Sequence, residues 1–315
     1  MKKFHLKYLL HAAVVIGLIV IGIKYLSSEE IFQALRDFDY SYATFLLLLS
    51  PGYLFLKAWR FVLLLQPLER KLAWWPVFKA YIAGEAASFV PGGIAARAGL
   101  LKQAGIPLRE GSIPVLFSSV QDQVVLITGA LIVALWFERG RLPVLIILGV
   151  IAVIAILLAI PTTRRPITRA TEWGAGKFNL RDEWRESLKN IPEVITWSTM
   201  STTLMLTMAS FALHIVMLQL AIEGVGISPS YSVVALAYLL PTVLGRLSGS
   251  PGGVGVTEAA MVGFLTSTSE LNYASGFAAV AIFRIAAVVF IGLFSVAVYF
   301  LTWNGEQETA NVTSS

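Results

Sequence analysis

The triplet Pro-Gly-Gly occurs twice inside strongly apolar stretches of this chain, at residues 91–93 and 251–253, about half of the 315-residue length apart. Proline ends the helix that precedes it, and two glycines then open backbone conformations that other residues avoid. Ionisable residues flank each triplet, and lipid-facing helices rarely tolerate such residues. Helices that break in corresponding places of two halves are typical of transporter-like cores. The triplets therefore indicate a membrane fold with two interrupted helical segments, each lining a cavity.

The composition is that of an integral membrane protein. Hydrophobic residues make up 57% and charged residues 14% of the chain, and the mean hydropathy is +0.74, whereas about 25% of a soluble domain is charged. Several apolar stretches reach the roughly 20 residues that cross a bilayer as a helix. Residues 8–26 lack a small-residue cleavage site, which predicts a retained helix rather than a signal peptide. We predict an all-α polytopic protein of the cell membrane, the inner membrane in a bacterium.

Basic residues gather near the N-terminus and between residues 164 and 189, as the positive-inside rule requires. This distribution accounts for the pI near 9.4 without nucleic-acid binding. Both termini and the basic loop 161–191 are expected in the cytoplasm, with the loop against membrane lipids, and the polar tail 304–315 is expected to be disordered. The predicted membrane helices cover about residues 8–26, 41–65, 112–137, 142–160, 193–222 and 275–303.

These segments predict one transmembrane domain, residues 1–303, that contains an inverted repeat. The first repeat covers about residues 41–137 and the second about residues 193–303, and each consists of a helix, a triplet segment and a helix. On this path the two triplet segments enter the membrane from opposite sides. Re-entrant hairpins and fully spanning hairpins give the same topology, and the shortness of the first favours re-entry there.

Ionisable residues of opposite sign occupy corresponding positions of the two repeats. The matched positions are Glu85 with Arg246, Arg97 with Glu258, and Asp122 with Arg284. Corresponding positions near the axis of an inverted repeat face each other, so we predict that at least one pair is a buried ion pair. Burying an unpaired charge costs roughly 2.5–3.5 kcal/mol even on the lenient insertion scale. The alternative is that some of these side chains reach the interface and remain in water.

Five glycines are expected to let a ligand approach the backbone closely. They are Gly92, Gly93, Gly252, Gly253 and Gly255. A half-helix that starts after each break directs free N–H groups and its positive dipole end at the break, which suits an anionic group such as phosphate. The alternative is a turn of packing value only. Glu258 either favours the start of the following helix or binds a cation, a proton or an amine headgroup.

Catalytic motifs are absent from the sequence. The glycine-rich run before Glu258 follows no strand and contains no lysine, which excludes a P-loop. His5, His11 and His214 show no metal-ligand spacing, and His214 is expected to be packed and hydrogen-bonded. The chain has no cysteine and no nucleophile elbow. We therefore expect a protein that is not an enzyme and that uses no cofactor or metal.

The second half contains Pro241, the segment from Ser250 to Glu258, and the segment from Ala279 to Arg284. Together they resemble the hallmark block of the flippase-like membrane family, which includes the membrane domain of lysylphosphatidylglycerol synthases. The first half is similar in Arg60, in Pro91-Gly92-Gly93 with Arg97, and in Asp122. It departs from the family at Ala95 and Ala96, where an acidic residue and an arginine are usual, and at Ser119 and Gln121, where an arginine-containing pair is common. The resemblance covers roughly residues 10–303.

The resemblance implies a module that moves charged phospholipid across the membrane, while a separate soluble domain performs the synthesis. A domain of roughly 100–200 residues cannot fit in residues 304–315, so we expect the flippase part standing alone. Such a protein does not make lysyl-lipid by itself, and a separate lipid-modifying enzyme is a candidate partner.

Lipid translocation is therefore the leading hypothesis, with an anionic or zwitterionic phospholipid or a lipid-linked molecule as substrate. Its headgroup would enter a charged cavity between the repeats. Arg97, Arg246 and Arg284 would hold phosphate through their guanidinium forks. Glu85, Asp122 and Glu258 would balance these arginines or contact a cationic headgroup.

Three other functions are compatible with the same features. Broken helices also serve ion-coupled secondary transport of a small polar solute. A membrane enzyme acting on a lipid-linked substrate would need a catalytic base and a donor site, which the sequence does not display. A scaffold would use the basic loop 161–191 to recruit acidic lipids or a lipid-modifying enzyme.

Overall fold

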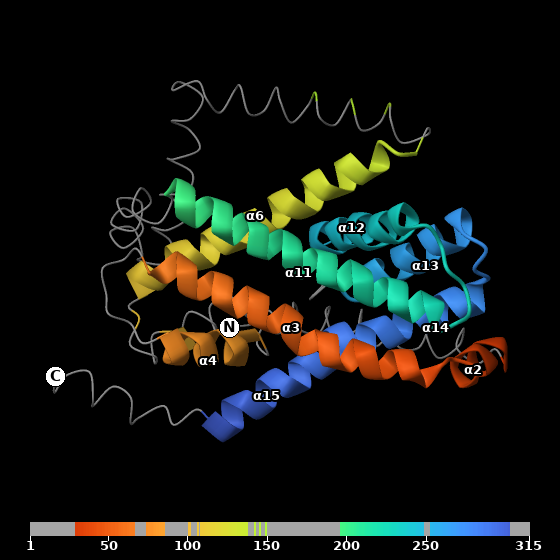
Figure 1. The fold of residues 1–315 in the computed structure, drawn as a ribbon, viewed down its shortest axis with the longest axis horizontal. Helices are drawn as coiled ribbons and strands as arrows, with labels where there is room; N and C mark the ends of the chain where they lie inside the picture. The colour runs from red at the N-terminus through yellow and green to blue at the C-terminus, as the bar shows by residue number, and fades with distance from the viewer. Residues whose placement is uncertain are drawn as a thin grey trace, which may run out of the picture.

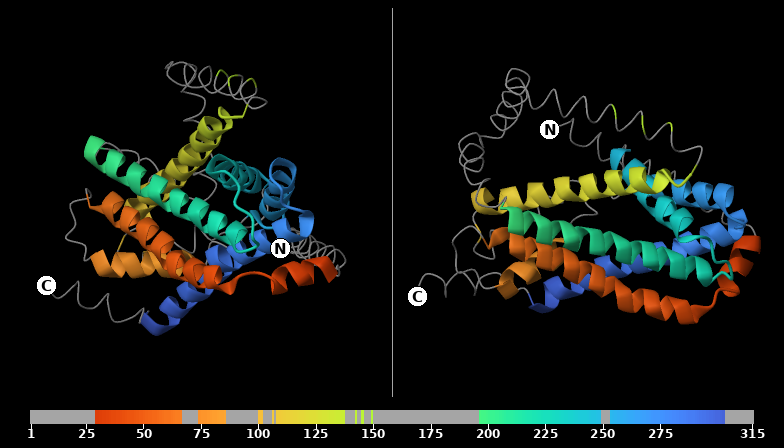
Figure 2. Two further views of the ribbon diagram at one scale, coloured as in Figure 1. Left: turned by 45° about the vertical axis from the view of Figure 1, so that its right-hand side comes forward. Right: turned by 45° about the horizontal axis from the view of Figure 1, so that its top comes forward.

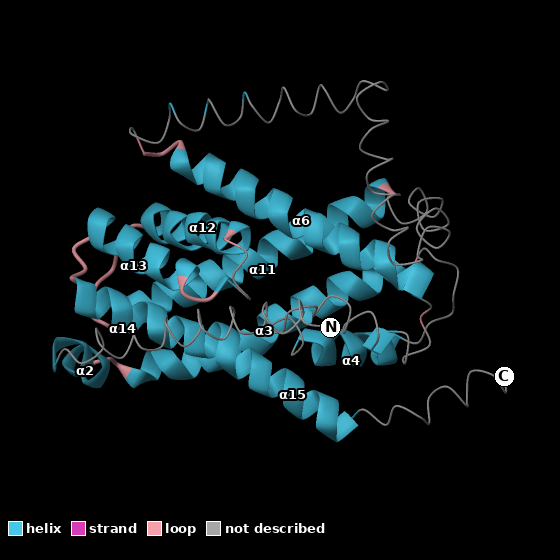
Figure 3. Ribbon diagram, turned by 180° about the vertical axis from the view of Figure 1, so that it is seen from behind, coloured by secondary structure: helices cyan, strands magenta, loops and turns pink. Residues whose placement is uncertain are grey.

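The computed structural model describes residues 29–66, 74–85, 100–101, 106, 108–137, 142, 145, 149, 196–248 and 253–302. Within these ranges the chain is almost entirely helical and contains no strand. The predicted helices 8–26 and 142–160, the basic loop 161–191, the tail 304–315 and the first triplet lie largely or wholly outside the described residues. Figure 3 shows the described part from behind, with helices and a few short connecting loops.

The described helices follow one another in a single bundle (Figure 1). They are α2 (Glu29–Arg36), α3 (Tyr40–Leu65), α4 (Trp74–Glu85), α6 (Leu108–Ala134), α11 (Trp197–Glu223), α12 (Tyr231–Leu247), α13 (Val256–Thr268), α14 (Tyr273–Arg284) and α15 (Ile291–Thr302), with the π-helix η3 (Ile285–Phe290) between the last two.

Four helical segments are long and apolar enough to cross a membrane. They are Tyr40–Leu65, Pro114–Ala134, Trp197–Glu223 and Tyr273–Leu301. They confirm the helices predicted at 41–65, 112–137, 193–222 and 275–303, although α6 already begins at Leu108. The all-helical membrane fold is therefore as the sequence indicated.

Side-chain caps define where several of these helices begin. An Asp39 carboxylate oxygen accepts a hydrogen bond from the Ser41 N–H at the start of α3, at 2.9 Å. Thr196 caps α11 by accepting from the Thr199 N–H at 3.2 Å, and Asn272 caps α14 by accepting from the Ser275 N–H at 2.8 Å. Such caps satisfy N–H groups that a helix leaves without partners in its first turn.

The two central helices, α3 and α11, lie side by side and run in opposite directions (Figures 1 and 2). α6 and the continuous segment α14–η3–α15 flank this pair. Helix α4 lies at one end of the bundle and packs on α3 and α15, whereas α12 and α13 lie at the other end and pack on α6, α11 and α14. A core of buried apolar side chains from α6, α11, α12, α13 and α14 fills the second half.

The two helices on either side of the second triplet pack against each other. Helix α12 ends at Leu247 and α13 starts at Val256, so the helix is interrupted between these residues, while residues 249–252 lie outside the described residues. With 17 and 13 residues, the two arms are about 26 and 20 Å long, shorter than the roughly 30 Å of a hydrocarbon core.

Close contact between the two arms depends on glycine. Gly253 has a φ of 70°, a left-handed conformation that other residues avoid. A methyl group on Gly245 would lie 1.9 Å from the Thr257 hydroxyl oxygen and 3.3 Å from the Gly253 Cα. The buried Thr257 therefore occupies the space that a side chain at Gly245 would need.

We predict that Gly245→Ala destabilises the protein by about 1–3 kcal/mol, the usual range for overpacking. The measurement is thermal unfolding of the detergent-solubilised protein. Gly263→Ala is the matched control, because nothing lies within 4 Å of the added methyl group at that position of α13. Equal unfolding temperatures for the two variants would show that the arms are not packed as described.

Candidate functional site

A cavity of about 530 Å³ opens between α3, α4, α6 and α12. Four charged residues line it, and each comes from a different helix: Lys57, Glu85, Asp122 and Arg246. Three of them are predicted site residues, and Lys57 is not. The first three belong to the first half of the chain and Arg246 to the second, so the cavity lies where the two halves meet.

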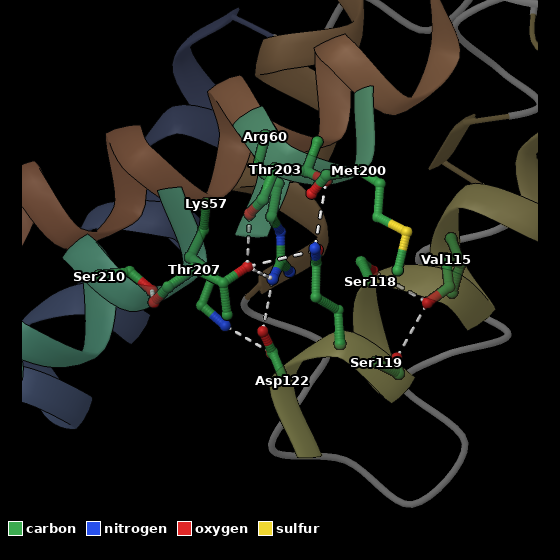
Figure 4. Close-up of polar contacts among 11 residues, drawn as sticks. Lys57, Arg60, Val115, Ser118, Ser119, Asp122, Met200, Thr203, Thr207 and Ser210 are labelled. Carbon is green, nitrogen blue, oxygen red and sulfur yellow. Dashed lines mark hydrogen bonds and ion pairs between the residues drawn. The ribbon is translucent and has the colours of Figure 1, made fainter. Parts of the chain in front are cut away.

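Asp122, which lines this cavity, forms two ion pairs with basic residues of α3 (Figure 4). The Lys57 Nζ donates to one carboxylate oxygen, and the Arg60 Nη1 donates to the other at 2.5 Å. Both basic residues are almost fully buried, with 5% of Lys57 and 1% of Arg60 exposed. One carboxylate thus compensates two cations, and the contact ties α3 to α6.

Helix α11 completes this cluster with hydroxyl groups. The Arg60 Nη1 also donates to the Thr207 hydroxyl oxygen at 2.7 Å, and the Gln121 Nε2 donates to the Thr203 hydroxyl oxygen at 3.1 Å. Thr203, Thr207 and Ser210 are fully buried and recur at the spacing of one helix face. Three helices therefore share one hydrogen-bonded polar cluster inside the membrane-spanning part of the fold.

One aromatic ring, that of Phe211, lies close to both cations of the cavity wall. The Lys57 Nζ lies 4.9 Å from the centre of the Phe211 ring, and the Arg246 Cζ lies 5.9 Å from the same centre. Cations within about 6 Å of a ring centre are attracted to its face. Arg246 is exposed to the cavity and makes no ion pair with any residue of the described part, which leaves its guanidinium available to an anion.

His214 is packed and hydrogen-bonded, as predicted. Its Nδ1 lies 2.8 Å from the Tyr238 hydroxyl oxygen, and its ring stacks on the ring of Tyr53 at 3.7 Å between centres. Tyr53 in turn lines the cavity. Among the described residues, no group of three acidic or histidine side chains could hold a metal ion.

A second ion pair lies at the start of α13. The Arg284 Nε lies 2.5 Å from one Glu258 carboxylate oxygen, and the other oxygen accepts a hydrogen bond from the Gly255 N–H at 2.6 Å. Gly255 has a φ of 87°, which places its N–H toward the carboxylate. Glu258 therefore caps α13 and fixes it to the end of α14.

The prediction that at least one matched pair is a buried ion pair stays open, but Asp122 and Arg284 do not form such a pair. Asp122 pairs with Lys57 and Arg60, and Arg284 pairs with Glu258, because side chains on adjacent helices of the same half lie closer than the matched positions. Glu85 and Arg246 do line one cavity. Arg97, Gly92, Gly93 and Gly252 lie outside the described residues, so the predictions for them stay open.

Sequence reasoning missed Lys57. It has no counterpart at the matched position of the second half, which was the criterion used to select charges. The available signal was its place three residues before Arg60 in the apolar helix 41–65. Two basic residues on one face of a membrane helix require a buried acidic partner.

The fold and the site together define an integral membrane protein with a charged cavity between its membrane helices. Comparison with protein families gives the class a name: residues 8–295 match the family described as the lysylphosphatidylglycerol synthase TM region, and the chain belongs to this family. A search among curated proteins gave no match.

We predict that Asp122→Asn destabilises the protein by about 3–5 kcal/mol, since it leaves Lys57 and Arg60 buried without their counter-charge. Thermal unfolding in detergent measures the effect. Asp37→Asn removes the same charge from an exposed position and should change stability by less than about 0.5 kcal/mol. If the two variants unfold at the same temperature, the contact of Asp122 with Lys57 and Arg60 does not hold α3 to α6.

The two roles of Glu258 can be separated by two substitutions. Glu258→Gln keeps an oxygen that can accept from the Gly255 N–H but loses the charge that faces Arg284, whereas Glu258→Ala loses both contacts. We expect Glu258→Ala to be the less stable by about 1 kcal/mol, the usual contribution of a cap. Thermal unfolding again provides the measurement, with Glu270→Gln at an exposed position as control. Equal losses in both Glu258 variants would contradict the capping role.

Proposed function

We propose that this protein moves lipids across the membrane, with the polar headgroup in the cavity between α3, α4, α6 and α12. One observation supports the proposal above the others: the cavity is lined by four charged residues between helices that are long enough to span a bilayer. Ionisable groups inside a membrane protein are costly and usually mark the path of a polar substrate.

The outer wall of the cavity suits the acyl chains. Val120 and Val124 line the cavity from α6, and about half of each side chain is exposed. Leu116 is exposed on the same helix, one turn before Val120, so that these three side chains form one apolar strip. A lipid on this face would keep its chains in hydrocarbon while its headgroup reaches Arg246 and Lys57.

Packing between the helices supports the inverted repeat. Exchange of the two halves would match α3 with α11, α4 with α12, and α6 with α14–η3–α15. The contacts agree with this exchange. The contact of α4 with α15 corresponds to that of α12 with α6, and the contact of α3 with α4 corresponds to that of α11 with α12. The opposite placement of α4 and of the α12–α13 hairpin at the two ends of the bundle agrees with it (Figure 1). An inverted repeat can open the same site alternately to the two sides.

The charged residues have distinct roles in this proposal. Arg246 holds the phosphate, because it is the exposed guanidinium of the cavity wall and presents a bidentate fork. Glu85 faces a cationic part of the headgroup. Glu258 and Arg284 hold the hairpin in place, and Arg97 with the glycines of both triplets completes the path. The protein binds and releases its substrate without a catalytic step, in the cell membrane and with both termini in the cytoplasm.

We predict that purified protein in liposomes moves fluorescent phosphatidylglycerol between leaflets, measured as the fraction that dithionite can bleach. Arg246→Ala should slow this movement at least about tenfold, because charge-assisted hydrogen bonds contribute about 1.5–3 kcal/mol. Arg246→Lys should retain part of the rate, since lysine keeps the charge but not the fork.

The matched control is Arg36→Ala, which removes an exposed arginine on α2 and should leave the rate unchanged. Absence of lipid movement by folded wild-type protein would refute lipid translocation and favour transport of a small polar solute. Movement that is insensitive to Arg246→Ala would remove the headgroup from this cavity.

A further inference from the structure

The charges around the cavity do not balance when every group is ionised. The described positive groups are Lys57, Arg60 and Arg246, and the described negative groups are Glu85 and Asp122. One carboxylate, that of Asp122, serves both Lys57 and Arg60. Among the described residues, the cluster therefore carries one more positive than negative charge, in a setting where excess charge is unfavourable.

Lys57 is the group that can remove this excess. Arginine keeps its proton in proteins, whereas a buried lysine can release one. If Lys57 becomes neutral, its amine still donates a hydrogen bond to Asp122, and Arg60 still holds the other carboxylate oxygen at 2.5 Å. The rings of Tyr53 and Phe211, whose centres lie 5.5 and 4.9 Å from Nζ, attract the charged amine, and the neutral amine occupies no more space. The contacts of the cluster thus allow both states of Lys57.

A phosphate anion in the cavity would reverse the balance. It would add one negative charge beside Lys57 and Arg246, which both line the cavity, and would match the charge of protonated Lys57. We propose that Lys57 takes up a proton when a phosphodiester anion enters the cavity and releases the proton when the anion leaves. The proposal rests on the headgroup site of the proposed function and adds a coupling ion to it. The coupling is reciprocal, so protons strengthen anion binding as much as the anion strengthens proton binding.

Four helices contribute charged groups close to Lys57. The negative groups are Asp122 on α6 and Glu85 on α4. The positive groups are Arg246 on α12 and Arg60, which lies one turn from Lys57 on α3. The other titratable groups nearby are Tyr53, Tyr81, His214 and Tyr238. His214 is already hydrogen-bonded to Tyr238 and stacked on Tyr53, which separates it from the cavity. Lys57 is therefore the group that both faces the cavity and shares its counter-charge.

In this proposal the proton and the anion cross the membrane together. The proton passes from water on one side to the Lys57 Nζ as the anion binds, and returns to water on the other side when the anion leaves. The carried unit is neutral, because one proton accompanies one negative charge. Movement of the anionic lipid should then respond to a pH gradient across the membrane.

The test measures proton uptake on binding, which does not depend on transport. Purified protein in weakly buffered detergent receives dioctanoyl phosphatidylglycerol, and a pH-indicator dye reports protons taken up per lipid bound. We expect up to about one proton per lipid, with the value falling toward zero at acid pH, where Lys57 is already charged. Binding without proton uptake at every pH at which the protein stays folded would overturn the proposal, and so would the absence of binding by both this lipid and dimethyl phosphate.

Two variants identify the group. Lys57→Arg carries a charge that cannot be released, so proton uptake per lipid bound should disappear whatever the affinity becomes. Lys79→Arg makes the same change outside the cavity lining and should leave the uptake intact. Uptake that persists in Lys57→Arg would assign the proton to another group and overturn the proposal. If Lys57→Arg does not fold, the wild-type measurement decides alone.

The ligand series separates this inference from the proposed function. Dimethyl phosphate carries the same phosphodiester anion without acyl chains. Proton uptake with both ligands confirms the coupling, and uptake with dimethyl phosphate alone confirms it for a water-soluble anion. Lipid movement in liposomes without proton uptake on binding would leave the proposed function standing and refute only the coupling.

Discussion

Charge inside the membrane-spanning bundle has to be compensated locally, and the contact of Asp122 with Lys57 and Arg60 does this for the first half of the chain. This three-residue contact also joins α3 to α6. Thr207 extends the same hydrogen-bonded cluster to α11. Without the carboxylate, two cations would remain in a low-dielectric core. The arrangement of the three helices therefore depends on this one buried acid.

The second half satisfies the same constraint differently. Its acid, Glu258, lies at the start of a short helix rather than within a long one, and it serves both the Gly255 N–H and Arg284. This contact fixes the α12–α13 hairpin, whose arms approach closely at Gly245 and Gly253. Each half thus pairs an acid with arginine, and Arg246 faces the cavity without an ion pair among the described residues. A guanidinium in that position is suited to bind an anion.

The sequence was most informative where one physical property decides the structure. Length and hydropathy located the helices at 41–65, 193–222 and 275–303, and proline with two glycines located the break between α12 and α13. Asp122, Glu258 and Arg284 were identified because they are charges at matched positions of two apolar halves, yet Asp122 and Arg284 do not pair with each other. The matched positions of a repeat do not encode which neighbouring side chain is nearest. Lys57 was missed for the same reason, since its role follows from its distance to Asp122 and not from any repeat.

The central claim is that a lipid headgroup enters the cavity, and a cysteine reporter tests it most directly. The chain has no cysteine, so Ser119→Cys, on the cavity wall in α6, would be the sole thiol. In liposomes that contain a phospholipid with a maleimide headgroup, we expect Ser119→Cys to form a covalent adduct, and the buried Ser210→Cys to remain unmodified. The contradicting result is a Ser119→Cys protein that reacts with a water-soluble maleimide but never with the lipid-borne one.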